Sequence, residues 1–480
     1  PLRFSVILNV ATTAAKNAGK SLGRASLPPS DEVKETETLL SPEIPAVEKI
    51  ALVTRKISKL LAFPFTVAKA LKVADSDRSG APELARVIEA DPVIAASLLK
   101  VANTVFFASS NRRISSIPDA IVRIGFRETK RIVMSMSVMG LFSQENRSAG
   151  FSRIGFWYHC LSVALVADQV AKSMREVSTE EAFLAGLLHD FGVILLDEFF
   201  PEVFLCLLEK TAESGRQFGE VTASTLGIGL HDIVSEVFTR WKIPEAVTEG
   251  ICNHHRVNES AFAPDTPGKK LAVCAGLGDI IAKSLGVGRE CDQFVRPVGN
   301  HVFAVAHLEQ GLTESISEML KREIVQYGAF LSLDSAEIGL DRKEFEGVED
   351  RKVAVINLTD EVFVPAYHHL SSLGFAVENV SGAASLDTID KRYHALVVWA
   401  GEQVSAEAVQ PFFRITSPPV EGVGHEQQLA PTVVVSSHGP ADSGQHHVRH
   451  LPREFDLRIL NPRVAEALLG IPSSTPKSAS

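Results

Sequence analysis

The strongest constraint on the fold is a change in the spacing of apolar residues along the chain. From about Val47 to Tyr327, apolar side chains recur three and four residues apart in long segments such as ELARVIEADPVIAASLLKVAN and EAFLAGLLHDFGVILLDEFF. This is the 3.6-residue period of an α-helix that buries one face. Its repetition over many segments predicts an all-helical domain.

After about Asp350 the pattern changes to short β-branched runs. The runs are KVAVINL, HALVVWA and TVVVSS, and helical or loop stretches separate them. Strands that alternate with helices are typical of a small parallel α/β sheet. The chain of 480 residues is also too long for one hydrophobic core, because cores stop growing at about 250–300 residues. We therefore predict a multidomain protein, with a helical bundle followed by a small α/β domain.

Composition sets the outer limits of these domains. Residues 17–48 mix Gly, Ser, Pro and charged residues without a sustained apolar stripe, and the chain ends in IPSSTPKSAS. Such composition is typical of linkers and disordered tails. The expected division is an N-terminal arm or linker over 1–48, a helical domain over 49–345, an α/β domain over 350–470 and a disordered tail over 471–480.

Two helix starts can be recognised inside the helical region. Asp91 precedes Pro92, and Ser116 precedes Ile117 and Pro118. A polar side chain followed by proline in the first turn is typical of a helix N-terminus, because proline has no N–H that the helix would need to bond there.

Charge and composition limit the classes of partner. The net charge of −10 argues against the basic surface that nucleic acid requires. No run reaches the roughly 20 unbroken apolar residues of a membrane span, which argues against membrane insertion. The five cysteines are scattered without a CxxC pair, which indicates a reducing compartment and hence the cytoplasm.

An ordered series of potential metal ligands runs through the helical region. The series consists of His159, His189, Asp190, His231, His254, His255 and Asp279. Each member falls in or beside a helical segment, so a bundle could bring them to one interior point. Imidazole and carboxylate ligands suit Fe, Mn or Zn, and such an ion can activate water for attack on phosphorus. With fifteen histidines in the chain, hydrogen-bonded core histidines are the alternative.

Several motifs of the helical region resemble the HDOD domain, an HD-related output domain. The DPxLxxxLLxxAN pattern and the following Ser-Ile-xx-Ala-Ile-xx-Leu-Gly turn of that family have counterparts in DPVIAASLLKVAN and SIPDAIVRIG. Three further segments, FWYHCLSVALVADQVA, EEAFLAGLLHDFGVILL and GLHDIVSEVFTRWKIPEAVTEGICNHH, resemble the second half of the domain. The resemblance extends from about residue 55 to residue 285.

This resemblance implies an all-helical regulatory module of bacterial signal transduction. The family is related to HD and HD-GYP phosphodiesterases but is generally regarded as lacking their catalysis. Its members would bind other signalling proteins or a small ligand, and a homodimer is a further arrangement. The expected function is therefore a non-catalytic regulator that has no catalytic residues. Because this chain keeps the complete histidine and aspartate series, metal binding remains open.

The alternative is a divergent metal-dependent phosphohydrolase or cyclic-dinucleotide phosphodiesterase of the HD superfamily. The HDxGK motif of HD-GYP enzymes reads His189-Asp190-Phe191-Gly192-Val193 in this chain, and no GYP-like segment follows. Valine thus replaces the lysine that could stabilise a phosphate oxygen. A missing cation removes a stabilising interaction from a phosphoryl-transfer transition state, which favours the non-catalytic reading.

Residues 350–470 resemble a receiver domain that has lost its phosphorylation chemistry. The positions that align with the acidic pair, the phosphate acceptor, the hydroxyl and the lysine of receivers hold Asn357 with Leu358, Trp399, Ser436 and Asn461. Without carboxylates there is neither a Mg²⁺ site nor a nucleophile. We therefore predict a degenerate receiver-like domain used for docking or dimerisation. Asp360 is the alternative source of one acid if the register is shifted.

Overall fold

The computed structural model describes most of the helical region and parts of the C-terminal region. The described residues are 30–57, 64–73, 77–104, 107, 113–259, 261–289, 291–292, 294–295, 298–308, 310–339, 352–358, 364–372, 375–381, 393–400, 409, 412, 432–435, 448–451 and 455–456.

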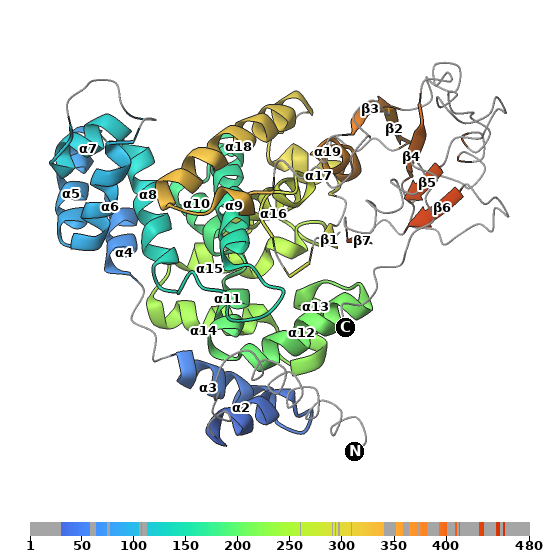
Figure 1. Cartoon of the computed structure of the whole chain (residues 1–480), viewed down its shortest axis with the longest axis horizontal. Coiled ribbons are helices and arrows are strands. Elements are labelled where there is room, and N and C mark those ends of the chain that lie inside the picture. Colours follow the sequence, from blue (N-terminus) through green and yellow to red (C-terminus); the bar gives the residue numbers. More distant parts are fainter. Residues whose placement is uncertain are drawn as a thin grey trace.

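The predicted all-helical region is confirmed (Figure 1). Its elements are α2 (Ser30–Leu40), α3 (Ala46–Ile57), α4 (Phe65–Lys72), α5 (Asp77–Glu89), α6 (Pro92–Ala102), α7 (Ile117–Ile124), α8 (Phe126–Met139), α9 (Arg153–Met174), α10 (Thr179–Leu188), α11 (Phe191–Phe199), α12 (Pro201–Ser214), α13 (Phe218–Leu226), α14 (Leu230–Trp241), α15 (Glu245–Asn253), η1 (His254–Arg256), α16 (Pro267–Ser284), α17 (Asn300–Val305), α18 (Gln310–Leu331) and η2 (Ser335–Glu337).

The helices form two unequal groups joined by α8. Helices α4 to α7 lie together at one side of the molecule and pack against α8 (Figure 1). In turn, α8 contacts α10 and α18 of the larger group. At the centre of that larger group, α9 packs against α10 and α16, and α15 packs against α16. The candidate metal ligands lie on these central elements.

Both expected helix starts are confirmed. The carboxylate of Asp91 accepts hydrogen bonds from the backbone N–H groups of Val93 and Ile94 at the start of α6. The hydroxyl of Ser116 accepts one from Asp119 N at the start of α7. Such caps satisfy N–H groups that have no partner inside the helix, which explains why these polar residues begin the helices.

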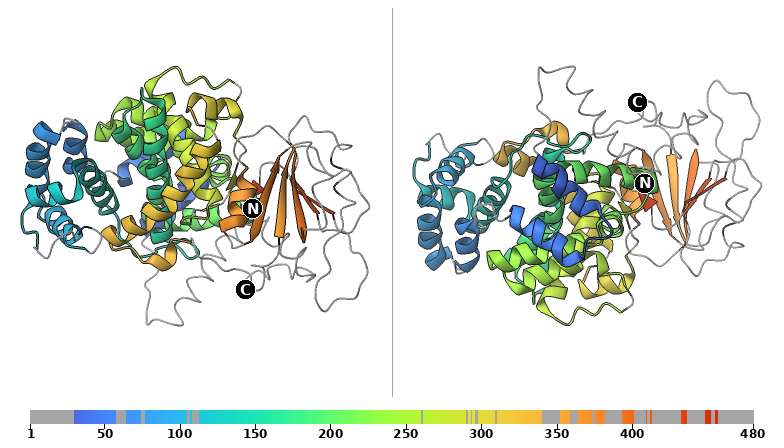
Figure 2. Two further views of the ribbon diagram at one scale, coloured as in Figure 1. Left: turned by 90° about the horizontal axis from the view of Figure 1, so that it is seen from above. Right: turned by 90° about the horizontal axis from the view of Figure 1, so that it is seen from below.

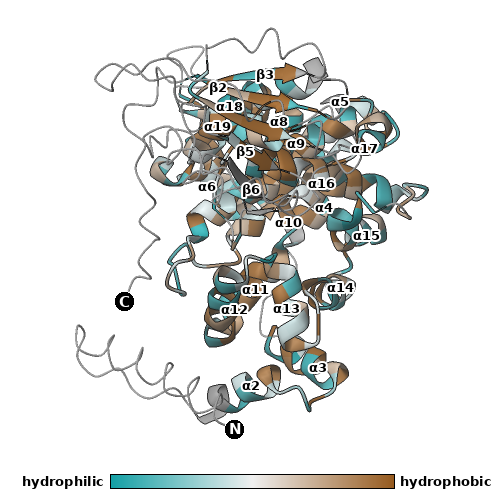
Figure 3. Ribbon diagram, turned by 90° about the vertical axis from the view of Figure 1, so that its right-hand side faces the viewer, coloured by the Kyte–Doolittle hydropathy of each residue, from teal (hydrophilic) through white to brown (hydrophobic). Residues whose placement is uncertain are grey.

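Helix α9 is the central helix of the protein. It is long and apolar enough to cross a membrane by length and composition, but 89% of its most apolar window is buried by the rest of the protein. Its helical neighbours bury nearly every side chain from Phe156 to Ala171. This is the pattern of a core helix in a folded domain. Figure 3 shows the same concentration of hydrophobic residues on the central helices and strands.

Two glycines allow neighbouring helices to approach the same turn of α9. A Cβ added to Gly186 of α10 would lie 2.7 Å from Ala164 Cα, and one added to Gly278 of α16 would lie 2.8 Å from Val163 O. Cβ atoms do not approach backbone atoms this closely in real proteins. The absence of side chains at these two positions therefore sets the distance between the three helices.

The segment expected to be an N-terminal linker contains a helix. Helix α2 packs against α12 and α13, and α3 packs against α11 and α14. Leu39 is fully buried, and Lys49 Nζ donates a hydrogen bond to Leu226 O at 2.6 Å. Sequence alone did not indicate this helix, because its sequence, SDEVKETETLL, is dominated by charged and polar residues.

The predicted C-terminal α/β unit contains a five-stranded parallel sheet. Its strands are β2 (Lys352–Asn357), β3 (Ala376–Ser381), β4 (Ala395–Trp399), β5 (Thr432–Val435) and β6 (Val448–Leu451). They are ordered β3-β2-β4-β5-β6, and all neighbouring pairs are parallel. This order, with the first strand between the second and the third, is the flavodoxin-like order of doubly wound folds.

The sheet is not a separate hydrophobic unit. Helix α19 (Pro365–Ser372) packs against β3 on one side and α16 on the other (Figure 2). Val353 and Val355 of β2 belong to the same apolar cluster as the central helices, whereas Ala354 and Ile356 belong to a second cluster on the other face. The helical core therefore continues into one face of the sheet.

A short two-stranded pairing makes a further connection. Strand β1 (Phe294–Val295) follows α16, and β7 (Phe455–Asp456) comes from the end of the chain. The two strands pair antiparallel, with Phe294 opposite Asp456. The limits expected for the domains from composition remain predictions, but the helical and sheet regions share both a core and a backbone pairing.

The close approach at Gly186 can be tested by adding one methyl group. We expect Gly186→Ala to lower the free energy of unfolding by about 1–3 kcal/mol, because the new Cβ overlaps the backbone of α9. The measurement is urea unfolding followed by circular dichroism. As a matched control, Gly219→Ala in α13 adds a Cβ that meets no atom within 4 Å, and it should leave stability unchanged or raise it by about 0.5–1 kcal/mol. Equal effects of the two substitutions would contradict the packing argument.

Candidate metal centre

Six of the seven predicted ligands lie together around the central helices. Helix α9 carries His159, α16 carries Asp279, and the junction between α10 and α11 carries His189 and Asp190. The short helix η1 carries His254 and His255. They form two groups of potential ligand atoms, His159 with His189 and Asp190, and Asp190 with His254 and His255. In each group these atoms lie within 4.8 Å of one another. Asp190 is common to both.

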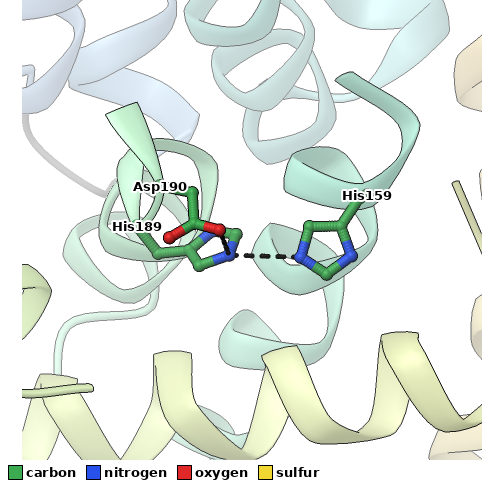
Figure 4. Close-up of side chains that lie close together, drawn as sticks. All are labelled: His159, His189 and Asp190. Atoms are coloured by element: carbon green, nitrogen blue, oxygen red, sulfur yellow. Dashed lines mark hydrogen bonds and ion pairs between the residues drawn. The ribbon is translucent and has the colours of Figure 1, made fainter. Parts of the chain in front are cut away.

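The first group is built around two facing imidazoles (Figure 4). His159 Nε2 and His189 Nε2 are 3.2 Å apart, and Asp190 Oδ2 lies 3.5 Å from His189 Nε2. Asp279 Oδ1 adds a carboxylate oxygen 3.2 Å from His159 Nε2. All four residues are buried. Nitrogen and oxygen ligand atoms from four side chains therefore lie close together in the core.

The second group shares Asp190 with the first. His254 Nε2 is 3.9 Å from Asp190 Oδ1, and His255 Nε2 is 3.9 Å from Asp279 Oδ2. The two rings are tilted by 47° relative to each other, with their centres 3.9 Å apart. His255 is partly exposed, so the cluster reaches from the core to the protein surface.

Backbone carbonyl groups orient two of the histidines. His189 Nδ1 lies 2.8 Å from Gly186 O, and His254 Nδ1 lies 2.6 Å from Ile251 O. A carbonyl oxygen can only accept, so each Nδ1 is the donor. In the neutral ring this leaves the lone pair on Nε2, the atom that faces the cluster. Metal-ligating histidines are usually held in this way by a second hydrogen bond.

His254 provides the clearest test of whether a metal fits. Burial, together with the neighbouring His255 and His189, holds the pKa of His254 well below its usual value. The ring is therefore neutral at neutral pH, which is the form that binds metal. Its Nε2 is buried and has no hydrogen-bond partner among the residues that the structure describes, an arrangement that costs free energy unless an ion or water occupies the position. The donor set fits Fe, Mn or Zn.

His231 is the predicted ligand that the structure does not bring into the cluster. Its side chain is 63% exposed at the start of α14, and its nearest ionic partner is the adjacent Asp232, at 3.4 Å. The ring lies against Gly229, where no side chain opposes it. The expectation that His231 joins the other ligands is corrected here: spacing along the sequence did not reveal that this residue lies on the outer side of a helix start.

A pocket beside the cluster contains a cation that sequence reasoning missed. Asp190 and His255 line this pocket, and so do Val193 and Lys283. Val193 occupies the lysine position of the HDxGK motif. A different lysine, Lys283 of α16, lines the same pocket. Lys283 follows Asp279 by four residues, a spacing that places both on one face of a helix. That spacing was the available signal.

Comparisons with family models and with curated proteins both give matches. Residues 60–257 match the model of the HDOD domain. An uncharacterized protein of Treponema pallidum (strain Nichols) is 23% identical over 239 residues, which are 50% of this chain and 44% of the relative. This chain thus aligns with less than half of that protein.

Comparison with solved structures gives several similar chains. A candidate signal transduction protein of Marinobacter aquaeolei VT8 is 22% identical with a TM-score of 0.48, over 63% of this chain and 65% of that one. An HDOD domain protein of unknown function from Geobacter sulfurreducens is 21% identical with a TM-score of 0.47, over 60% and 98%. A candidate phosphohydrolase from Shewanella amazonensis SB2B is 22% identical with a TM-score of 0.44, over 58% and 97%.

The family match covers the helical segments whose motifs resemble the HDOD domain, and it includes five of the six clustered ligands; Asp279 lies beyond its end. Within residues 60–257, this chain contains an HDOD domain.

Proposed function

We propose that the HDOD domain binds a divalent metal ion and acts as a regulatory binding module in signal transduction. The observation that carries this proposal is the convergence of three histidines and two aspartates in the core, with the two best-oriented rings directed by backbone carbonyls. Imidazole nitrogens and carboxylate oxygens gathered this closely are ligands that suit Fe, Mn or Zn.

The residues that would hold the ion are those of the two groups that share Asp190, together with Asp279. When bound, a divalent cation would supply Lewis acidity and a concentrated positive charge. The chain's own contribution is to keep the His254 imidazole neutral, to direct Nε2 of His189 and His254 inward, and to exclude most water by burial. The exposed edge at His255 leaves a route from solvent.

The apolar side chain of Val193 favours a ligand-binding role over catalytic turnover of a phosphate ester. A hydrophobic residue at this position cannot neutralise charge on a phosphoryl group during transfer. The second candidate, a metal-dependent phosphohydrolase, is favoured by one observation: Lys283 lines the same pocket as Val193. The names of the structural neighbours include both signalling and phosphohydrolase roles, so they do not separate the two candidates.

We propose that the C-terminal sheet is a degenerate receiver domain that docks a signalling partner or a second copy of the chain. Its strand order supports this. Asn357 and Trp399 end the adjacent strands β2 and β4 and pair with each other, at the edge where receivers carry their acidic residues. Both side chains are buried, and neither can bind Mg²⁺ or accept a phosphoryl group as a carboxylate does. Ser436, Asp360 and Asn461 lie outside the described residues. We also propose that the protein acts in the cytoplasm.

The metal proposal predicts that two adjacent ligands are indispensable. The double variant His189→Ala with Asp190→Ala should lose bound Mn, Fe or Zn, because both metal-ligand groups are broken at once. The measurement is metal content per chain by inductively coupled plasma mass spectrometry, after loading and desalting.

A matched control removes one histidine and one acid at the surface. His301→Ala with Glu314→Ala changes two exposed residues and should keep the wild-type metal content. His231→Ala should also retain most of the metal, because its ring faces solvent. Unchanged metal content in the His189 and Asp190 double variant would contradict the proposal.

The regulatory reading predicts that the metal-loaded protein does not hydrolyse cyclic dinucleotides, because no lysine follows the His-Asp pair in the motif. Product formation is measured by chromatography at a high protein concentration over hours. Hydrolysis that is lost in the His189 and Asp190 double variant would instead establish the second candidate, the phosphohydrolase.

The degenerate receiver predicts that the C-terminal region does not accept phosphate. Incubation with acetyl phosphate and Mg²⁺ should leave the intact mass unchanged, because the positions aligned with the acid pair and the acceptor hold Asn357, Leu358 and Trp399. An added phosphate that maps to residues 350–470 would contradict the prediction and would indicate a shifted register, with Asp360 restoring an acid.

A further inference from the structure

The carboxylate of Asp279 presents its two oxygens to different neighbours. Oδ1 lies 3.2 Å from His159 Nε2 and 3.9 Å from His189 Nε2. Oδ2 accepts a hydrogen bond from Lys283 Nζ at 3.3 Å and lies 3.9 Å from His255 Nε2. The oxygen that faces the two buried histidines is therefore not the oxygen that contacts the lysine.

The position of Lys283 is set by its own helix. Lys283 and Asp279 both belong to α16, and a spacing of four residues places them on one face of that helix, one turn apart. Their side chains are 3% and 6% exposed. A surface lysine extends its ammonium group into water, whereas this one is enclosed together with the carboxylate that it contacts. The ion pair is thus part of the core beside the metal cluster.

Asp292 provides a second carboxylate near the same ammonium group. Its Oδ1 lies 3.8 Å from Lys283 Nζ. Asp292 is fixed by the backbone, because its Oδ2 accepts a hydrogen bond from Phe218 N at 2.6 Å and its Oδ1 accepts one from Phe294 N at 3.0 Å. Of these two carboxylates, that of Asp279 is the closer to the ammonium group.

The ion pair limits what Asp279 can offer to a metal ion. A carboxylate binds a metal through one oxygen or through both, and Ca²⁺ takes about 6–8 oxygen ligands, often with both oxygens of a carboxylate. Zn²⁺ is usually bound by four ligands and accepts imidazole nitrogen readily. One oxygen of Asp279, added to the group formed by His159, His189 and Asp190, makes four donor atoms. Such a set suits Zn²⁺ and similar transition metals better than Ca²⁺.

We propose that Lys283 makes the centre selective for transition metals against Ca²⁺, because it occupies Oδ2 of Asp279 and leaves this carboxylate one oxygen for the metal. Lys283 is a positioning residue in this scheme, since it acts through Asp279 and does not contact the metal itself. The inference rests on the metal binding proposed above and adds the residue that decides between two classes of ion.

The test compares Zn²⁺ and Ca²⁺ binding to the full chain. Each affinity is measured by competition with a chromophoric chelator, and Zn²⁺ bound by the His189 and Asp190 double variant is subtracted as background. In Lys283→Met, the ratio of Zn²⁺ affinity to Ca²⁺ affinity should fall by about tenfold to a hundredfold, comparable to the usual effect of losing a group that orients a metal ligand.

The ratio separates the oxygen of Asp279 from the charge of the lysine. Both ions carry two positive charges, so the loss of the ammonium charge changes the two affinities alike. The second oxygen of Asp279, once released, favours Ca²⁺. A change in the ratio therefore reports how Asp279 is positioned, which a general loss of stability or of charge does not alter.

Three further variants complete the test. Lys269→Met removes a partly exposed lysine of the same helix, paired with Asp265, and should leave the ratio unchanged. Asp292→Asn removes a buried charge beside Lys283 but leaves the closer contact with Asp279 in place, so the ratio should also be unchanged. Lys283→Gln keeps a polar end that is uncharged and one bond shorter; it should lower the ratio by a smaller factor than Lys283→Met, and it serves if that variant does not fold.

Each outcome bears on a different claim. If the wild-type protein binds Zn²⁺ and the ratio is unchanged in Lys283→Met, or in Lys283→Gln where the first variant does not fold, the selectivity proposal is overturned and the metal centre stands. An equal fall of the ratio in Asp292→Asn or Lys269→Met overturns it as well, because the effect would then come from charge and not from Asp279. If the wild-type protein binds no divalent metal above the background, the metal centre and its selectivity both fail.

Discussion

The arrangement of the whole centre depends on the close approach of α10 and α16 to one turn of α9. Gly186 and Gly278 contact the backbone of Val163 and Ala164 at distances that leave no room for a side chain. His159 lies one turn earlier on α9, His189 follows three residues after Gly186, and Asp279 follows Gly278 directly. The same contacts that pack the helices therefore bring ligands from three separate helices within hydrogen-bond distance. Gly186 also supplies the carbonyl group that orients His189.

This packing buries polar groups at positions where apolar side chains would cost less free energy. Burying carboxylates and imidazoles away from water costs several kcal/mol unless each finds a partner. Several contacts in the cluster exceed ordinary hydrogen-bond distances, such as 3.9 Å between His254 Nε2 and Asp190 Oδ1. The separation is too long for a strong bond between the two side chains and suits an atom placed between them. A structural core would gain more from Leu or Val at these positions, so their presence favours a bound ion.

The helical region was predictable because its signals are local. The apolar period marks α9 and α16, and the caps at Asp91 and Ser116 mark helix starts, so each can be read from a few neighbouring residues. The convergence of ligands followed from their spacing and from the family resemblance. The exposure of individual side chains near helix ends could not be predicted, because it depends on how each helix packs against its neighbours. His231 has the residue type of a ligand, but it lies on the exposed side of its helix start. Lys283 has the residue type of a surface lysine but is buried.

The boundary between the helices and the sheet shows that the spacing of apolar residues does not reveal where one hydrophobic core ends. The pattern changes near residue 350 because helices give way to strands, and that change says nothing about where the core ends. Strand β7 pairs with β1, and Phe294 of β1 donates its N–H to Asp292, the residue that faces Lys283. Helix α19 packs on α16, which carries Lys283 and Asp279. The C-terminal sheet is thus connected to Asp292 and to α16 by a backbone pairing and by a helix contact, so the sheet and the centre of the helical region belong to one packed body.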